Sequence, residues 1–391
     1  LPEIVKSYYP WINVIPEHIP DNAITERVAV AYATDSCPDI LYDTYSRIAP
    51  AVSGGLAVDL TDVYEANKDV FIAEPQDGVK DGKHYYLPVY ADAPYCVQVN
   101  MDLAEELGVA DLLPAEEEPW SYEEFLTLCR AVKAADPNIY PISLFGGSQS
   151  SDGWDFSMFL GSGARFLNDD KTASIVNQPG NREKIIEVLE LYQTLAEEKL
   201  IPDGAAAMTA GDCGAMFRAG QLLMCAGAYN GIPGLYHQME DGNCIEMNAV
   251  GRLQPSPNGE MVTTASYGTG GLAVYDSNGK AEAAKLVVDA LMKDQAWRQA
   301  VISTAGVSPV TVDVIAEYET PELTQMMAFA TEVFNTYGDS SWGILDPFWT
   351  DTRSVFFPLK QDLFTGNITP EEFVEQWEPL MTDAIANYNA G

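Results

Sequence analysis

"KHYYLPVYADAPYCVQV", residues 83–99, places two apolar, strand-like runs on either side of a short segment, ADAP, at 91–94. Similar runs recur at 38–43 (PDILYD), 221–227 (QLLMCAG) and 270–276 (GGLAVYD). Amphipathic helical patterns lie between these runs. Because strands that alternate with helices are typical of α/β domains, the pattern predicts an α/β fold with mostly parallel sheets flanked by helices.

Four longer segments carry helix signals. Ser121 with Glu124, and Thr369 with Glu372, have the spacing of a capping box, which marks the first turn of a helix. Apolar residues that recur every three or four positions extend the pattern. The predicted helices cover 120–135, 181–199, 280–302 and 369–388. No Pro/Gly/Ser-rich linker separates two halves, so we expect domains joined by strand crossings.

The charge of the chain limits its partners. Its 391 residues suffice for two domains, and 58 acidic residues against 21 Lys and Arg give a formal net charge of -37. The negative electrostatic potential of such a chain excludes a dominant basic surface for nucleic acid. It also disfavours anionic substrates and anionic lipid surfaces. This potential neither attracts nor repels a neutral ligand, and it attracts a cationic ligand. Solubility alone also accounts for such a charge.

The start of the sequence has no signal-peptide pattern, and the apolar runs are shorter than the roughly 18–20 residues of a membrane span. The first residues resemble the end of an amphipathic helix, followed by a strand-like run at 12–16. An α/β domain rarely begins in this way. We therefore expect upstream residues, including a strand and an export signal, outside this numbering.

Known catalytic and metal motifs are absent from the sequence. It has three histidines and no GxSxG, HExxH, P-loop or dinucleotide pattern. A glycosidase carboxylate pair stays open, because a chain with 58 acidic residues always offers one. The six cysteines include no CxxC pair, and one disulfide among Cys213, Cys225 and Cys244 stays open. The sequence predicts no catalytic residue, metal site or cofactor.

Aromatic residues in Gly/Ser/Asp-rich settings are the strongest functional signal. Trp154, Tyr229, Trp342 and Trp349 all lie in such segments. In DPFWTDTRSVF, residues 346–356, Trp349 and Arg353 are one helical turn apart. A sugar ring stacks its C–H face on an aromatic ring while its hydroxyls bind Asp, Asn and Arg. Each aromatic alone is at least as well explained as core, but together they favour a sugar site.

Six segments, in consistent order, resemble the family-1 extracellular solute-binding proteins of ABC importers, the maltose-binding-protein-like carbohydrate binders. The first five segments are YPWINVIPE, ATDSCPDILYDTYSRIAPAVSGGLAVDLTD, DGKHYYLPVYADAPYCVQVNMDLAEELGV, PWSYEEFLTLCRAV and FRAGQLLMCAGAYN. The sixth begins with GGLAVYDSNGKAEAAKLVV. Each motif is weak alone. Their coverage of nearly the whole chain makes the resemblance strong.

The resemblance implies a two-lobed, type II-like periplasmic-binding-protein fold with a ligand cleft between the lobes. The first lobe would comprise 1–91 and 268–315, with its N-terminal strand outside this numbering. The second would comprise 92–266 and 316–391. Hinges are expected near 90–94, 264–267 and about 315.

The family's site positions carry over residue by residue. Stacking aromatics would be Trp154, Tyr229 and Trp349, and Arg353 matches an arginine that lines the cleft. Asp43 stands where the family has an aromatic residue, which implies a different sugar or register. The expected ligand contacts are Asp35, Ser36, Asp43, Arg47, Tyr90, Asp92, Trp154, Tyr229, Asn230, Tyr267, Trp342, Trp349 and Arg353.

By this resemblance the chain is expected to capture a neutral sugar or oligosaccharide by lobe closure and deliver it to ABC permease transmembrane subunits. It would be a monomer without a cofactor, periplasmic or anchored at the cell surface as a lipoprotein. The same fold with a cationic ligand such as a polyamine is the first alternative. An extracellular carbohydrate-active enzyme is the second.

Overall fold

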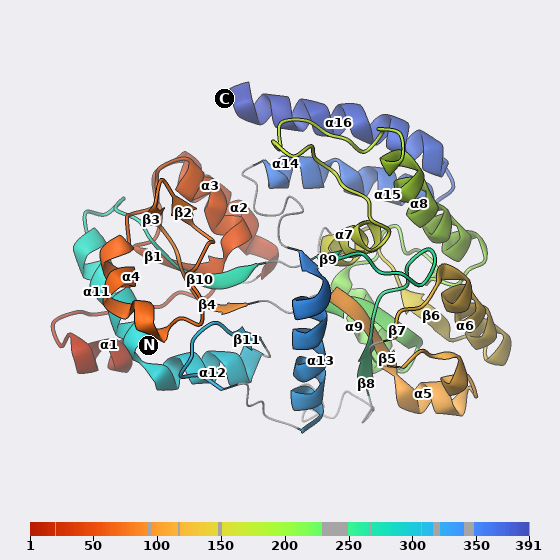
Figure 1. The fold of residues 1–391 in the computed structure, drawn as a ribbon, viewed down its shortest axis with the longest axis horizontal. Helices are drawn as coiled ribbons and strands as arrows, with labels where there is room; N and C mark the ends of the chain where they lie inside the picture. Colours follow the sequence, from red (N-terminus) through yellow and green to blue (C-terminus); the bar gives the residue numbers. More distant parts are fainter. Residues whose placement is uncertain are drawn as a thin grey trace. The chain divides into compact units, whose positions relative to one another are not determined.

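The computed structural model describes residues 1–19, 21–91, 95–115, 118–147, 151–228, 249–265, 268–305, 307–315, 321–339 and 348–390. The chain divides into two compact units, coloured along the sequence in Figure 1. Unit 1 comprises Leu1–Asp92, Tyr267–Thr324 and Leu345–Pro347. Unit 2 comprises Ala93–Ser266, Gln325–Ile344 and Phe348–Gly391.

Unit 1 is built on a four-stranded sheet of order β1-β10-β4-β11. Its strands are β1 (Ile40–Thr44), β4 (Leu87–Ala91), β10 (Thr269–Val274) and β11 (Ser308–Pro309), and β2 (Val79–Lys80) pairs with β3 (Lys83–His84). Its helices are α1 (Pro2–Tyr8), α2 (Asp21–Ala33), α3 (Tyr45–Ser53), α4 (Thr61–Asn67), the 3₁₀ turn η1 (Lys68–Val70), α11 (Ala281–Lys293) and α12 (Gln295–Ala305).

Successive residues at the end of β10, and Tyr275 just after it, face two different cores. Leu272 and Val274 pack with α1, α4 and α11, whereas Ala273 and Tyr275 pack with α2 and α3. Side chains alternate across a strand, so this division places helices on both faces of the sheet.

Unit 2 contains a second four-stranded sheet, of order β6-β7-β5-β8. Its strands are β5 (Tyr95–Asn100), β6 (Tyr140–Ser143), β7 (Leu222–Ala228) and β8 (Ala249–Arg252), and β9 (Thr264–Ala265) pairs with β12 (Gly338–Asp339). Its helices are α5 (Met101–Glu106), the 3₁₀ turn η2 (Ala110–Leu112), α6 (Tyr122–Ala135), α7 (Asp152–Gly161), α8 (Asn181–Glu197), α9 (Ala210–Arg218), α14 (Trp349–Ser354), α15 (Phe356–Phe364) and α16 (Pro370–Ala390). α13 (Pro321–Tyr337) contributes residues to both units.

The prediction of mostly parallel sheets is wrong. Among the described strands only β6–β7 and the short β9–β12 pair are parallel. β10 returns from late in the chain and lies between β1 and β4, antiparallel to both. Alternation of strands and helices does not reveal such an insertion, because the pattern carries no strand direction.

Two predicted elements also differ. The strand-like run at 12–16 forms no regular structure, although Ile12 and Val14 pack against a core. The single helix at 280–302 is two helices, α11 and α12, because the Asp294 carboxylate accepts a hydrogen bond from the Trp297 N–H at 2.8 Å and starts a new helix. The capping boxes at Ser121 and Thr369 are confirmed.

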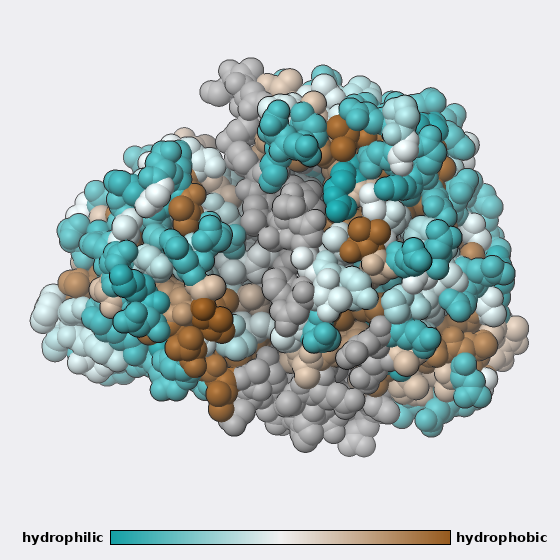
Figure 2. All heavy atoms as spheres, viewed as in Figure 1, coloured by the Kyte–Doolittle hydropathy of each residue, from teal (hydrophilic) through white to brown (hydrophobic). Residues whose placement is uncertain are grey.

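The visible surface is mostly hydrophilic, with separate apolar patches (Figure 2). In the part of the chain that the structure describes, no helix is long and apolar enough to cross a membrane.

Candidate functional site

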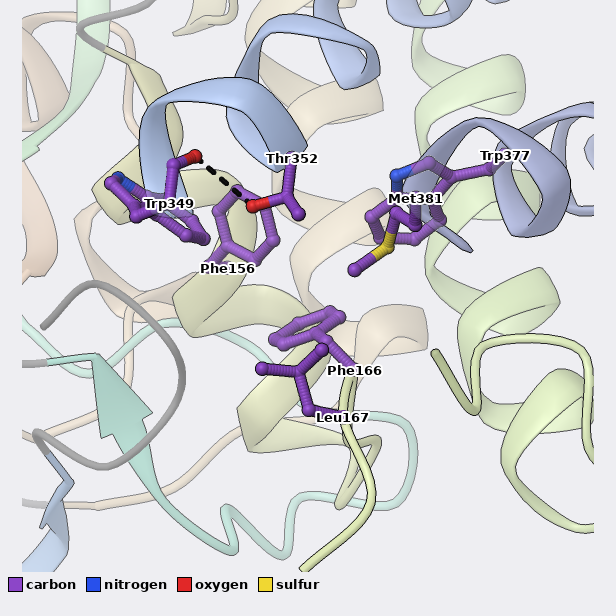
Figure 3. Close-up of a pocket in the computed structure, with 7 residues that line it drawn as sticks. All are labelled: Phe156, Phe166, Leu167, Trp349, Thr352, Trp377 and Met381. Atoms are coloured by element: carbon purple, nitrogen blue, oxygen red, sulfur yellow. Dashed lines mark hydrogen bonds between the residues drawn. The ribbon is translucent and has the colours of Figure 1, made fainter. Parts of the chain in front are cut away.

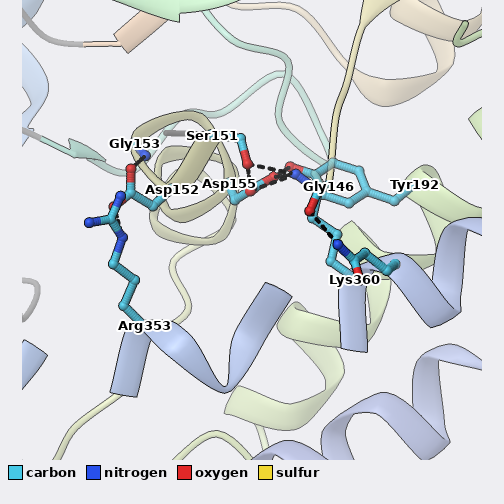
Figure 4. Close-up of polar contacts among 9 residues, drawn as sticks. Gly146, Ser151, Asp152, Gly153, Asp155, Tyr192, Arg353 and Lys360 are labelled. Carbon is cyan, nitrogen blue, oxygen red and sulfur yellow. Dashed lines mark hydrogen bonds and ion pairs between the residues drawn. The ribbon is translucent and has the colours of Figure 1, made fainter. Parts of the chain in front are cut away.

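The first turn of α7 in unit 2 carries a buried carboxylate that binds Arg353. Oδ1 of Asp152 accepts a hydrogen bond from the Gly153 N–H at 2.9 Å, and Oδ2 forms an ion pair with Arg353 Nε at 2.8 Å. The Asp152 side chain is buried and that of Arg353 is 22% exposed. A carboxylate is favoured at a helix N-terminus, where it meets the positive end of the dipole. The pair therefore attaches α14 to the start of α7 (Figure 4).

Trp349 is the first residue of α14, so Trp349 and Arg353 lie one turn apart on that helix. The indole is 7% exposed and meets the Phe156 ring edge to face, with centroids 4.9 Å apart. A cavity of about 10 Å³, room for about one water molecule, lies beside it (Figure 3). Its lining residues are Phe156, Phe166, Leu167, Trp349, Thr352, Trp377 and Met381.

Trp154 lies in α7 and is 2% exposed. Both predicted stacking aromatics of unit 2 that the structure describes are thus almost fully buried. Each would have to expose a ring face to stack on a sugar. Their stacking role stays a prediction.

A fully buried ion pair lies next to these residues. Lys360 Nζ, in α15, donates to Asp155 Oδ1 at 2.8 Å, to Oδ2 at 2.6 Å and to Ser151 Oγ at 3.0 Å. The Tyr192 hydroxyl, in α8, donates to Asp155 Oδ1 at 2.9 Å (Figure 4). Burial lowers the pKa of Lys360 and raises the pKa of Asp155, while the attraction between the two groups opposes both changes.

Tyr95, the first residue of β5, was not predicted as a site residue. Its ring lies so close to Gly153 that a Cβ added there would be 2.0 Å from Tyr95 Cε2. A half-buried tyrosine therefore lies against the turn that also carries Asp152. The sequence signal was an aromatic residue at the start of a strand, which is too common to single it out.

In unit 1, Asp43 and Arg47 form a two-bond ion pair where β1 runs into α3. Arg47 Nε donates to Oδ2 at 2.7 Å and Nη2 donates to Oδ1 at 2.5 Å. The Arg47 side chain is 31% exposed. This fork geometry holds the guanidinium in one orientation at the strand end.

A second carboxylate of unit 1, Asp77, is held by a residue of β10. Asp77 accepts a hydrogen bond from Thr269 Oγ1 at 2.6 Å, and burial raises its pKa although that bond opposes the rise. Its charge contributes to raising the pKa of Tyr45 to about 12, although burial of the phenol is the main cause. No sequence signal marks Asp77, because its surroundings depend on Thr269, which lies far along the chain.

The other predicted residues of unit 1 have structural contacts. Asp35, with a positive φ of 48°, accepts a hydrogen bond from Ser277, and the Ser36 N–H donates to the Ala31 carbonyl, so both close the end of α2. Tyr90 is half-buried, and its ring lies against Gly270. These contacts give no sign of ligand binding, and the roles stay predictions.

Five predicted residues lie outside the described residues: Asp92, Tyr229, Asn230, Tyr267 and Trp342. Cys213 and Cys225 are free thiols, and Cys244 also lies outside the described part of the chain. Within the described ranges, no group of His, Cys, Asp and Glu is arranged to hold a metal ion.

Comparison with solved structures finds close folds at low sequence identity. An ABC transporter solute-binding protein from Thermotoga lettingae, bound with α-D-tagatose, has a TM-score of 0.79 at 15% identity, covering 98% of this chain and 95% of that chain. Maltose-bound MalE3 of T. maritima has a TM-score of 0.76 at 18% identity, with 98% and 94% covered. The GacH receptor of Streptomyces glaucescens, solved unliganded and with acarbose, has a TM-score of 0.77 at 16% identity, with 98% and 93% covered.

These similarities confirm the two-lobed α/β fold. No curated protein sequence matches the chain. The family model for bacterial extracellular solute-binding proteins matches residues 1–297, about three quarters of the sequence. The chain therefore belongs to the bacterial extracellular solute-binding proteins.

Proposed function

We propose that this protein is the substrate-binding protein of an ABC importer and captures a neutral sugar or oligosaccharide. Binding would close the two lobes, and the closed form would deliver the sugar to the permease subunits. The predicted hinges, an extracellular or periplasmic location, lipoprotein anchoring and a monomeric state belong to the same proposal.

The observation that carries the proposal is the pairing of carboxylates with arginines. Asp43 binds Arg47 in unit 1, and Asp152 binds Arg353 in unit 2. Each pair is close to neutral and combines donors with acceptors. A sugar hydroxyl both donates and accepts, so such a pair suits a neutral polyol.

A polyamine needs the opposite arrangement, in which carboxylates are left without a cation of the protein. The net charge of -37 attracts cations in general. However, the Asp43 carboxylate is already paired with Arg47, and the Asp152 carboxylate is already paired with Arg353. The local geometry therefore favours the sugar.

The similar structures support this choice, because their names record tagatose, maltose and acarbose as bound molecules. The family and these neighbours are binding proteins, which supports binding rather than catalysis. Release of reducing ends from an oligosaccharide would instead reveal an enzyme.

Calorimetry against a panel of glucose, maltose, maltotriose, cellobiose and chitobiose, with putrescine and spermidine, tests the proposal. We expect saturable binding of at least one sugar that changes little between 20 and 300 mM NaCl. Spermidine binding that weakens steeply with salt, together with no sugar binding, would overturn it. Small-angle scattering with the bound sugar measures closure as a decrease in the radius of gyration.

Arginine-to-lysine variants test the two pairs. Arg47→Lys and Arg353→Lys keep the positive charge beside each carboxylate but remove the planar guanidinium group. We expect sugar affinity to fall about tenfold, which corresponds to the loss of roughly one charge-assisted hydrogen bond to the sugar. Arg130→Lys is the control, because Arg130 makes a two-bond contact like that of Arg47, but to Glu198 on the exposed surface. Equal affinity in all three variants would contradict a role for Arg47 and Arg353.

A further inference from the structure

The segment that carries Trp349 and Arg353 cannot fix its own orientation. α14 has six residues and no side-chain cap at its N-terminus. Helices this short are unstable in isolation, so their direction depends on tertiary contacts. Val355 ends α14 and precedes α15 directly, so whatever holds α15 also constrains α14.

Two neighbouring acidic residues of α7 hold this segment. Asp152 binds Arg353 of α14, and Asp155, one turn further along α7, binds Lys360 of α15 (Figure 4). The next residue, Gln361, donates to the Gly146 carbonyl at 2.8 Å. The start of α7 and the loop after β6 thus hold α14 and α15 at three points.

The Lys360–Asp155 pair has an environment that an ordinary surface pair lacks. Both side chains are 0% exposed. The ammonium also lies 5.4 Å from the centroid of the Phe364 ring and 5.7 Å from that of Tyr192. Ser151, the residue before α7, donates its hydroxyl to Asp155 instead of capping the helix. A buried pair of this kind adds little net stability but fixes geometry strongly, because any displacement leaves a charge without its partner.

We propose that Lys360 and Asp155 are positioning residues for the ligand face of α14, acting through Arg353 and Trp349. This inference rests on the proposed function, in which Arg353 contacts the sugar. The pair holds α15 on α7, and the orientation of α14 follows from that attachment. The Lys360–Asp155 pair therefore affects sugar binding only through the position of α14.

The test replaces the pair together, as Asp155→Asn with Lys360→Met, so that no lone charge stays buried. Asparagine still accepts the Tyr192 hydrogen bond, and methionine suits the surrounding aromatic rings. Replacing a buried pair by neutral groups is often neutral or stabilising. The Tm of the double variant is therefore expected to stay near that of wild type or to rise.

Two measurements follow on the folded variant. We expect hydrogen exchange of the 348–356 segment to accelerate about tenfold or more, with no change in α6. We also expect affinity for the tightest-binding sugar of the panel to weaken about 3- to 30-fold. Combined with Arg353→Lys, the effect on Kd should be clearly less than the product of the separate effects, because both changes act through one contact.

Several results would overturn the inference. One is that hydrogen exchange of α14 in the double variant is the same as in wild type. Another is that its sugar affinity is the same as in wild type, or that its effect on Kd and that of Arg353→Lys simply multiply when combined. Arg130→Met with Glu198→Gln, an exposed pair in the same unit, is the control and should leave both measurements unchanged. Failure of the proposed function is recognised separately, because wild type itself would then bind no sugar. The exchange measurement needs no sugar and still decides the positioning of α14.

Discussion

Gly153 and Gly211 each occupy the second position of a helix, α7 and α9, yet their surroundings differ. A Cβ at Gly153 would be 2.0 Å from the Tyr95 ring, whereas at Gly211 the nearest atom is Thr209 Oγ1 at 3.6 Å. The first contact requires the ring or the helix to move, while the second is ordinary van der Waals contact.

Gly153→Ala is therefore expected to destabilise the protein by about 1–3 kcal/mol through overpacking. Gly211→Ala is expected to stabilise it by about 0.5–1 kcal/mol, because alanine loses less backbone entropy in a helix. Urea unfolding of both variants measures the difference. Equal effects, or a stable Gly153→Ala, would show that the Tyr95 ring is free to leave its position.

Residue spacing predicted part of the unit 2 site, namely the relative position of Trp349 and Arg353. Trp349 and Arg353 were expected one turn apart on a helix, and both lie in α14. Their partners Asp152 and Phe156 come from a helix about 200 residues earlier, and only the tertiary fold brings them together. The sequence marked Trp154 by its type, but whether a ring is core or surface depends on what packs over it.

Helices were predicted best where their first turns carry side-chain caps. α6 begins after Ser121, whose hydroxyl accepts from the Glu124 N–H while the Glu124 carboxylate accepts from the Ser121 N–H. Such signals are local in sequence and need no tertiary information. Strand direction is not local, which is why the antiparallel insertion of β10 was missed.

Ser121→Ala is expected to lower the free energy of unfolding by about 1 kcal/mol, because it removes the N-cap of α6. Thr127→Ala is the matched control, since Thr127 is an exposed residue of the same helix whose hydroxyl bonds to the Glu123 carbonyl. That change should be neutral or stabilise by a few tenths of a kcal/mol. If the two variants unfold alike, the capping box contributes nothing measurable.

At the scale of the molecule, the order of six weak motifs along the chain predicted the two-lobed fold, and the family match and the similar structures confirm that fold. The charge of the chain excluded classes of partner without identifying one. The particular ligand was not predictable, because it depends on how side chains from segments far apart in sequence are placed. Five of the predicted ligand contacts also lie outside the described residues.

The same charge leads to a prediction about stability. Fifty-eight acidic residues face 21 Lys and Arg, so most carboxylates lack a cation and repel one another. Salt screens this repulsion, since the Debye length falls from about 30 Å at 0.01 M to about 8 Å at 0.15 M. Salt also weakens the exposed ion pairs, but these contribute only about 0–1 kcal/mol each and are held by direct hydrogen bonds.

The repulsion between carboxylates should therefore dominate. The Tm at pH 7 should rise by about 1–2 °C between 10 and 200 mM NaCl, which corresponds to about 1 kcal/mol in a chain of this size. Tetramethylammonium chloride should act like NaCl, because screening does not depend on the cation. A rise with Na⁺ alone would indicate a specific ion site instead. A fall in Tm with both salts would mean that the ion pairs, such as Asp43–Arg47 and Arg130–Glu198, outweigh the repulsion between unpaired carboxylates.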